Sequence, residues 1–104
     1  MTTRFHPQAS EDLVQAIEYF ESQQPGLGKR LGYIIADTLE SLEEFPDARP
    51  TIRGVIRRCP LRTFPFSLLY SSQKEGLFVL AVAHNHREPD FWVDRVSNSP
   101  QPIL

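Results

Sequence analysis

A group of polar and ionisable residues follows the most apolar segment of the chain. Residues 77–83 are all apolar, and they are followed directly by His84, Asn85, His86 and Arg87. Imidazole can transfer protons near neutral pH, and guanidinium can bind phosphate or carboxylate groups. An apolar run that stops at such residues places them where a buried strand reaches the surface. We therefore expect the working surface of the protein at this point.

Five arginines form a second group of residues that could do chemistry. They lie close together in the sequence: Arg49, Arg53, Arg57, Arg58 and Arg62. The formal net charge of the chain is only -2, but residues 1–48 carry three bases against nine acids, and residues 49–104 carry eight bases against four acids. A local positive stripe can attract phosphate or an acidic protein, because screening limits the reach of each charge to about 8 Å. The alternative is that these arginines form a solvated surface without a ligand.

The histidines and the single cysteine also have structural alternatives. We expect His84 and His86 to alternate across the strand, so that both do not face one substrate. A His-x-His pair without a third ligand nearby in the sequence is not diagnostic of a metal site, and we predict neither a metal nor a cofactor. Cys59 has no partner for an internal disulfide and no evident paired base, so we expect a semi-buried, inert thiol.

The chain has the length of one domain. Its 104 residues suffice for a single core, and we predict one domain over residues 1–104 with an ordered core at about 3–96. The first residues have no signal-peptide pattern, and the longest apolar run is far shorter than the roughly 18–20 residues that cross a bilayer. We therefore expect a cytoplasmic protein that does not contact a membrane.

Apolar spacing predicts a short strand and two helices in the first half of the chain. The strand covers Thr3–His6, and a first helix begins at Pro7 or at Ser10. A Pro- and Gly-containing break at residues 25–28 ends it, and a second helical pattern runs over residues 31–45. Together the two segments predict an antiparallel helical hairpin.

The second half of the chain predicts strands. They cover about residues 55–61, 66–72 and 77–84, with a glycine-containing turn before the last of them. The last strand is apolar on both alternating faces, so we expect it to be central in the sheet. A short helix within residues 89–96 closes the chain. The predicted fold is α+β, in the order β-α-α-β-β-β, with the helical hairpin packed on one side of a mainly antiparallel meander.

This order of elements and motifs resembles the RelE/ParE superfamily of toxin-antitoxin toxins, and it is closest to the ParE-like, plasmid-stabilisation branch. The motifs are Pro25-Gly26-Leu27-Gly28, Phe64-Pro65-Phe66 with Tyr70, and the segment from Ala83 to Trp92. The resemblance covers about residues 3–96. It implies a small toxin that a cognate antitoxin neutralises by direct binding, in a toxin-antitoxin hetero-oligomer. ParE-like members act on DNA gyrase without being enzymes, and RelE-like members cut messenger RNA in the ribosome.

The nuclease mode needs cations for the phosphate and groups that move protons. The resemblance offers Arg57, Arg58, Arg62 and Arg87 as cations. In this chain, His84 and His86 are the candidates for proton transfer. Nuclease members tend to have a Tyr or His near the C-terminus, where this chain has Phe91 and Trp92, which cannot act as acid or base. We therefore expect inhibition of gyrase by protein binding. The alternatives are a ribosome-dependent endoribonuclease and a non-toxic binding module of the same fold.

A helical hairpin on a sheet leaves grooves and an open strand edge that an antitoxin can use. The expected partner-binding residues are Leu31, Ile35, Arg62, Arg87, Phe91 and Trp92. The sequence pI of about 5.9 favours an interface with many apolar side chains. Three of these residues have structural alternatives, because Arg87 could form an ion pair with Glu88 or Asp90, and Phe91 and Trp92 could close the core.

Overall fold

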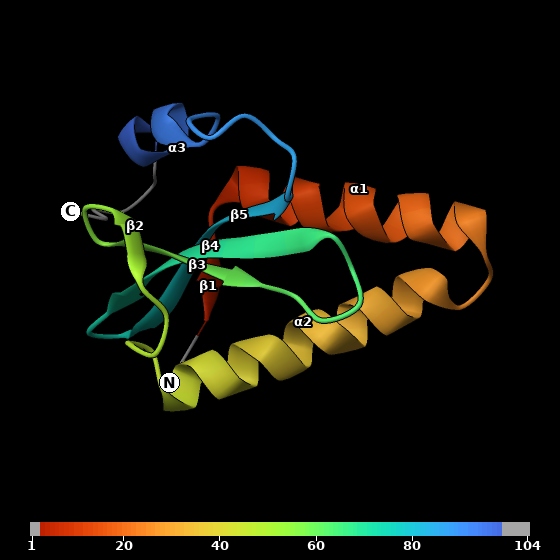
Figure 1. The fold of residues 1–104 in the computed structure, drawn as a ribbon, viewed down its shortest axis with the longest axis horizontal. Coiled ribbons are helices and arrows are strands. Elements are labelled where there is room, and N and C mark those ends of the chain that lie inside the picture. Colours follow the sequence, from red (N-terminus) through yellow and green to blue (C-terminus); the bar gives the residue numbers. More distant parts are fainter. Residues whose placement is uncertain (1–2, 99–104) are drawn as a thin grey trace.

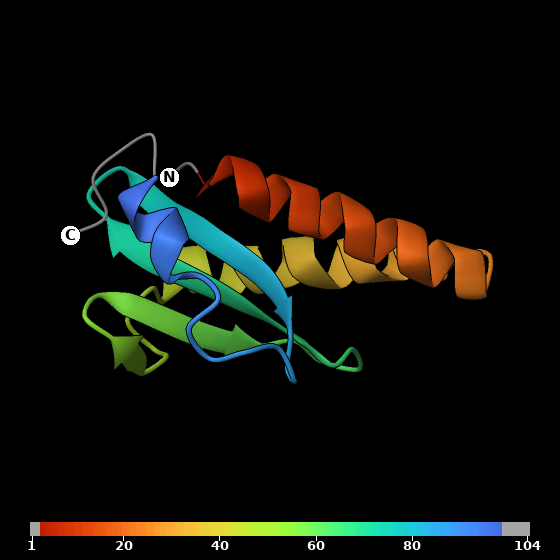
Figure 2. The same cartoon turned by 90° about the horizontal axis from the view of Figure 1, so that it is seen from above.

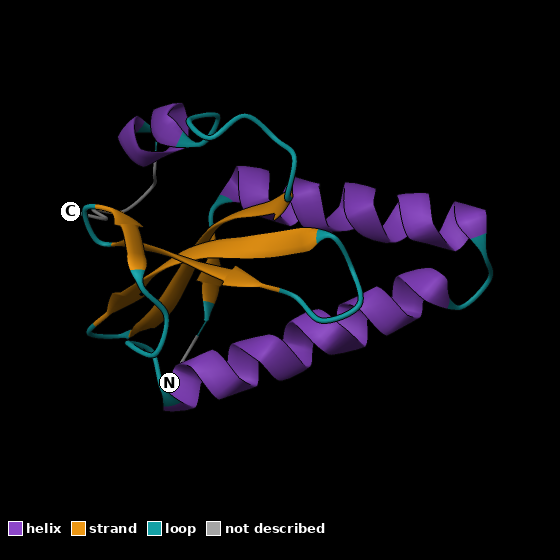
Figure 3. Ribbon diagram, in the orientation of Figure 1, coloured by secondary structure: helices purple, strands orange, loops and turns teal. Residues whose placement is uncertain are grey.

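The computed structural model describes residues 3–98. Figure 3 shows its helices and strands, which are β1 (Arg4–Phe5), α1 (Pro7–Gln23), α2 (Leu27–Glu44), β2 (Thr51–Arg53), β3 (Ile56–Pro60), β4 (Phe66–Gln73), β5 (Gly76–His84) and α3 (Val93–Ser97). The order confirms the predicted α+β fold with its helical hairpin, its meander of strands and its short C-terminal helix. Within the described residues, no helix is both long and apolar enough to cross a membrane.

All five strands form one mixed sheet in the order β1-β5-β4-β3-β2. β1 pairs with β5 in parallel, and the other neighbours pair antiparallel. The two long helices lie side by side and extend beyond the sheet (Figure 1), whereas α3 lies over the opposite face (Figure 2). The sheet therefore has one face under the hairpin and one that is only partly covered, which we call the open face.

The apolar strand β5 is buried on both faces. On the hairpin side, Val79 and Val82 join a core cluster with Leu31 of α2. On the other side, Leu80 joins a smaller cluster with Trp92. β5 lies between β1 and β4, which confirms the expectation that this strand is central.

The first helix begins at Pro7, not at the alternative start Ser10. Pro7 occupies the first turn, where a backbone N–H would have no acceptor within the helix, so the absence of this N–H costs no hydrogen bond. The buried His6 is the N-cap residue, and its Nδ1 accepts a hydrogen bond from the Gln8 amide at 3.0 Å. An imidazole replaces the usual hydroxyl or carboxylate cap here, which is why the sequence pattern also allowed a later start.

The turn between the helices is held by one side chain, Glu21 of α1. Its carboxylate accepts hydrogen bonds from the backbone amides of Gly26 and Gly28, at 2.9 and 3.1 Å. These amides belong to the start of α2, whose first N–H groups have no partner within the helix. Gly28 also lets the helices approach closely, because a Cβ there would lie 2.5 Å from the carbonyl oxygen of Ile17.

Gly28→Ala is expected to destabilise the protein by about 1–3 kcal/mol, because the new methyl group meets backbone that cannot move aside easily. Gly32→Ala is the matched control in the same helix, since its Cβ would lie 3.9 Å from the nearest atom, the Cδ1 of Ile17. That change is expected to be neutral or to stabilise by up to about 1 kcal/mol through helix propensity. Urea unfolding of the two variants checks this, and equal stabilities would contradict a close contact at Gly28.

Two details differ from the predicted elements. Phe45 was expected on the apolar face of α2, but it is 60 % exposed, because it is the C-cap residue and its backbone has already left the helix. β2 was not predicted, because it is only three residues long and all three are exposed, so its sequence is too short to show a strand pattern. β2 nevertheless pairs with β3 and forms the edge of the sheet.

Tyr70 of β4 packs in the hairpin-side core, as expected from its alternation with Phe66 and Leu68. It is completely buried, and its hydroxyl donates to the Pro46 carbonyl at 3.2 Å. Burial raises the pKa of this hydroxyl above its ordinary value. Tyr70 is therefore a satisfied core residue that joins the sheet to the end of α2.

Candidate partner-binding site on the open face of the sheet

The predicted arginine stripe is divided between the two faces of the sheet. Side chains alternate along β3, so Ile56 and Arg58 face the open side, whereas Cys59 packs in the hairpin-side core. Arg57 also leaves the open face and pairs with Asp47 at 3.3 Å. The five arginines therefore do not form one continuous positive surface, because neighbours along a strand point in opposite directions.

A cleft of about 350 Å³ lies on the open face, between the sheet and the segment that follows β5. Its polar and aromatic lining includes Arg53, Arg58, Asn85, Arg87, Phe91 and Trp92. The sheet supplies an apolar floor that includes Leu69 and Ala83. The residues after the apolar run thus meet part of the arginine group in one cleft.

Asn85 fixes the start of the segment that walls the cleft. Its side-chain oxygen accepts hydrogen bonds from the Ser67 hydroxyl at 2.6 Å and from Arg58 at 3.2 Å. Its backbone amide donates to the Pro65 carbonyl at 2.9 Å. Arg58 is therefore held over the cleft by a neutral acceptor, which leaves its charge available to a ligand.

The cleft holds three guanidinium groups, and only one of them has a carboxylate partner among the described residues. Arg53 pairs with Asp90 at 3.3 Å. Arg87 instead lies over the Phe91 ring, 4.1 Å from its centroid, so the expected alternative of an ion pair with Glu88 or Asp90 is not observed. Arg58 and Arg87 thus carry positive charges that no carboxylate of the described residues neutralises.

The aromatic wall of the cleft is anchored in the second core cluster. Trp92 is buried, and its indole N–H donates to the Pro89 carbonyl at 2.8 Å. Trp92 therefore closes the core, which was the structural alternative for it. Phe91 is half-buried and keeps one ring face under Arg87. Of the two aromatic residues expected to contact a partner, Phe91 is the more accessible.

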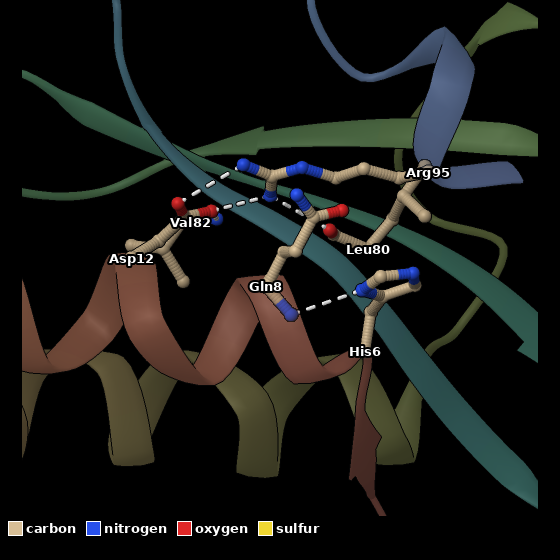
Figure 4. A network of polar contacts seen from close by, with 6 residues as sticks. All are labelled: His6, Gln8, Asp12, Leu80, Val82 and Arg95. Carbon is tan, nitrogen blue, oxygen red and sulfur yellow. Dashed lines mark hydrogen bonds and ion pairs between the residues drawn. The ribbon is translucent and has the colours of Figure 1, made fainter. Parts of the chain in front are cut away.

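An ion pair that the sequence did not predict holds this wall against α1. The side chains of Asp12 and Arg95 are only 10 % and 7 % exposed, and they form two contacts of 2.6 and 3.1 Å. Figure 4 shows that Arg95 points from α3 toward Asp12 across β5. Asp12 also accepts from the Val82 amide, and Arg95 donates to the Leu80 carbonyl. One buried pair therefore joins α1, β5 and α3.

The ion pair provides hydrogen-bond partners for backbone groups of β5. β1 pairs only with Phe78 and Val79, so the rest of that edge has no strand beside it. Asp12 and Arg95 satisfy backbone groups there, at Val82 and Leu80. The only sequence signal was an acid on the first helix and a base in the last turn of a short helix, which is too common to predict a pair.

Several predicted site residues lie away from the cleft. Arg62 pairs with Asp37 of α2 at 3.1 Å, on the hairpin side of the sheet. Leu31 and Ile35 were expected to bind a partner, but both are buried in the core, at 0 % and 3 % exposure. These two apolar residues of α2 face the sheet because the hairpin packs on it. They do not present a surface to a partner in this structure.

The expectation that His84 and His86 point apart is wrong. Their ring centroids lie 5.3 Å from one another, and the His86 amide donates to Nδ1 of His84. Residues two positions apart share a face of a strand, and the chain turns directly after β5. His84 lines a separate groove beside α1, which Arg87 also reaches. Neither imidazole lines the open-face cleft.

Cys59 is buried at 3 % exposure, which is deeper than the expected semi-buried position. Its Sγ lies 3.6 Å from the Pro60 carbonyl oxygen. Within residues 3–98, no group of three or more His, Cys, Asp and Glu side chains is arranged to hold a metal ion.

A family model of the ParE toxin of type II toxin-antitoxin systems, parDE, matches residues 3–89. The chain belongs to the ParE toxin family. This result confirms the resemblance to the ParE-like branch that the ordered motifs indicated.

A solved structure described as the chromosomal ParDE toxin-antitoxin system from P. aeruginosa has the same fold as this ParE family member. The TM-score is 0.70 at 17 % sequence identity, and the match covers 81 % of this chain and 95 % of the other. A search of curated proteins found no match. The similar structure supports the fold of the chain.

Proposed function

We propose that this ParE family member is the toxin of a type II pair and inhibits DNA gyrase by binding it through the open-face cleft. The observation that supports binding is the pair of arginines, Arg58 and Arg87, that have no carboxylate partner among residues 3–98. Beside them lie the Phe91 ring and an apolar floor. Arginine and aromatic side chains are the residues that contribute most to protein interfaces.

The same cleft gives less support to catalysis. Its described lining contains no His or Tyr, and its carboxylates are Glu88 and Asp90. Asp90 is engaged with Arg53, which disfavours it as a general base. The cognate antitoxin would neutralise the toxin by direct binding in the cytoplasm, in a toxin-antitoxin hetero-oligomer.

A ribosome-dependent endoribonuclease is the second candidate, and one observation favours it. Arg87 lies between the open-face cleft and the groove that contains His84, so a cation and an imidazole are near one another at the end of β5. Messenger RNA would then have to occupy the groove beside α1. A non-toxic binding module is the third candidate.

The test is DNA supercoiling by purified gyrase in the presence of the purified chain. The proposed function predicts that supercoiling stops at a stoichiometric excess of the chain. Full supercoiling at saturating chain, together with cutting of messenger RNA in a translation extract, would favour the nuclease instead.

A further inference from the structure

The groove beside α1 lies between this helix and the end of β5, and we call it the α1–β5 groove. Its volume is about 210 Å³. Ala16 and Val82 line it and are buried, so they form an apolar floor. Pockets for drug-sized ligands begin at roughly 300 Å³, so this groove suits one ring system with a small substituent.

Aromatic side chains form a continuous row along the α1–β5 groove. Tyr19 lies edge to face against Phe20, with 5.2 Å between the ring centroids. Phe66 contacts Phe20 in the same way at 5.8 Å, and it contacts His84 at 5.3 Å. The two ends of the row, Tyr19 and His84, are exposed and line the groove. Rings that are held in place by their neighbours can stack on the face of a nucleobase.

The β5 side of the groove offers two hydrogen-bond donors to an anion. Arg87 lines the groove and has no carboxylate partner among residues 3–98. Nδ1 of His84 accepts a hydrogen bond from the His86 amide at 3.1 Å, so the proton of the neutral imidazole lies on Nε2. His84 is exposed, and this N–H can donate to a ligand. A guanidinium and an imidazole N–H in one groove are suited to bind a phosphate.

Gln15 of α1 supplies a group that can select a base. It lines the groove and is exposed. Its primary amide presents a donor and an acceptor in one plane, which is the pattern that pairs with N6 and N7 of adenine. Asp12 also lines the groove, but its carboxylate is neutralised by Arg95 and does not oppose a phosphate.

The charges of α1 favour a single nucleotide over a strand. Glu11 and Glu18 line the adjoining depression on this helix, and neither pairs with a base among the described residues. They would repel the successive phosphates of a strand that crosses α1. A single nucleotide avoids this repulsion, because its one phosphate lies beside Arg87.

We propose that the α1–β5 groove is a binding site for a single adenine nucleotide. The base stacks on the Tyr19 ring and pairs with the Gln15 amide, and the phosphate binds to Arg87 and to Nε2–H of His84. Arg87 also lines the open-face cleft, so a bound nucleotide takes up one of the two cations of the cleft that lack a carboxylate partner among the described residues. The nucleotide site itself does not depend on the proposed action on gyrase.

Titration of the purified chain with adenosine monophosphate (AMP), followed by NMR of the backbone amides, tests this site. Saturable shifts are expected at Gln15, Tyr19 and His84. AMP should bind about tenfold more tightly than adenosine, because only the nucleotide carries the phosphate that the two donors bind. Absence of saturable shifts with AMP would overturn the site.

Four variants assign the contacts. Tyr19→Ala is expected to weaken AMP binding at least about fivefold, the usual loss for one stacked base. Arg87→Met should weaken it about tenfold and leave the affinity for adenosine unchanged. The matched controls are Tyr33→Ala, an aromatic residue that is 64 % exposed outside the groove, and Arg58→Met, which lies in the open-face cleft. Both controls should bind AMP within about twofold of the unchanged chain.

His84→Phe keeps the row of rings and removes only the N–H donor. It should weaken AMP binding about threefold without changing the affinity for adenosine, and it covers the case in which Arg87→Met does not fold. Unchanged AMP affinity in both Tyr19→Ala and His84→Phe would overturn the groove assignment. An oligonucleotide of deoxyadenosines that binds more tightly with each added nucleotide would overturn the single-nucleotide assignment and favour a strand in the groove, as the nuclease candidate requires.

Discussion

Arg95→Met is expected to lower the free energy of unfolding by about 3–5 kcal/mol, the usual cost of breaking a buried ion pair. The change leaves the Asp12 carboxylate at 10 % exposure without its cation. It also removes the donor to the Leu80 carbonyl, so a second buried polar group loses a partner. Chemical denaturation followed by circular dichroism measures the effect.

Two further variants separate the buried ion pair from surface electrostatics. Arg53→Met removes an exposed pair with Asp90, and it is expected to cost less than about 1 kcal/mol. The double variant Asp12→Asn with Arg95→Met removes both charges, while Asn can still accept from the Val82 amide. The double variant should lose clearly less stability than the sum of the losses measured for Asp12→Asn alone and Arg95→Met alone. An Arg95→Met variant as stable as Arg53→Met would contradict the role of this pair.

Charge reversal on the open face is expected to abolish toxicity without unfolding the protein. Arg58→Glu combined with Arg87→Glu should weaken inhibition of gyrase by at least about 30-fold, since reversed charges at an interface repel the partner that they formerly attracted. Both residues lie at the surface of the cleft, and neither has a carboxylate partner among residues 3–98. Supercoiling assays over a range of toxin concentrations measure the loss.

The matched control for this experiment is Arg30→Glu. Arg30 is an exposed arginine near the start of α2, outside the open-face cleft. The Arg30→Glu variant should inhibit gyrase within about twofold of the unchanged chain, because most surface substitutions have small effects. Equal inhibition by the open-face double variant would show that the cleft is not the toxic surface.

The layout of the fold was predictable because its signals are local. The apolar spacing of α1 and α2 and the two-sided apolar run of β5 identify the hairpin and the central strand without knowledge of contacts. β2 has no such signal, because an exposed edge strand gains only backbone hydrogen bonds from its neighbour. Phe45 was placed wrongly for a different reason. It is apolar and continues the helical spacing, but it lies beyond the end of α2.

The site was predictable only in part, because it depends on which face each side chain takes. The segment after β5 was placed correctly at the surface, and Arg58 and Arg87 do line one cleft. The alternation of β3 separates Arg57 from Arg58, and this separation depends on the pairing of β3 with β4. The contact between Asp12 and Arg95 joins residues at opposite ends of the chain, so only the folded structure shows it.

Induced expression of the chain without its antitoxin tests the central claim most directly, with growth, the DNA damage response and messenger RNA integrity followed in the same culture. Inhibition of gyrase by binding predicts growth arrest, a DNA damage response and intact transcripts. Arrest with transcripts cut at translated codons would show a nuclease and contradict this account. Normal growth with the folded protein present would contradict the assignment of toxicity altogether.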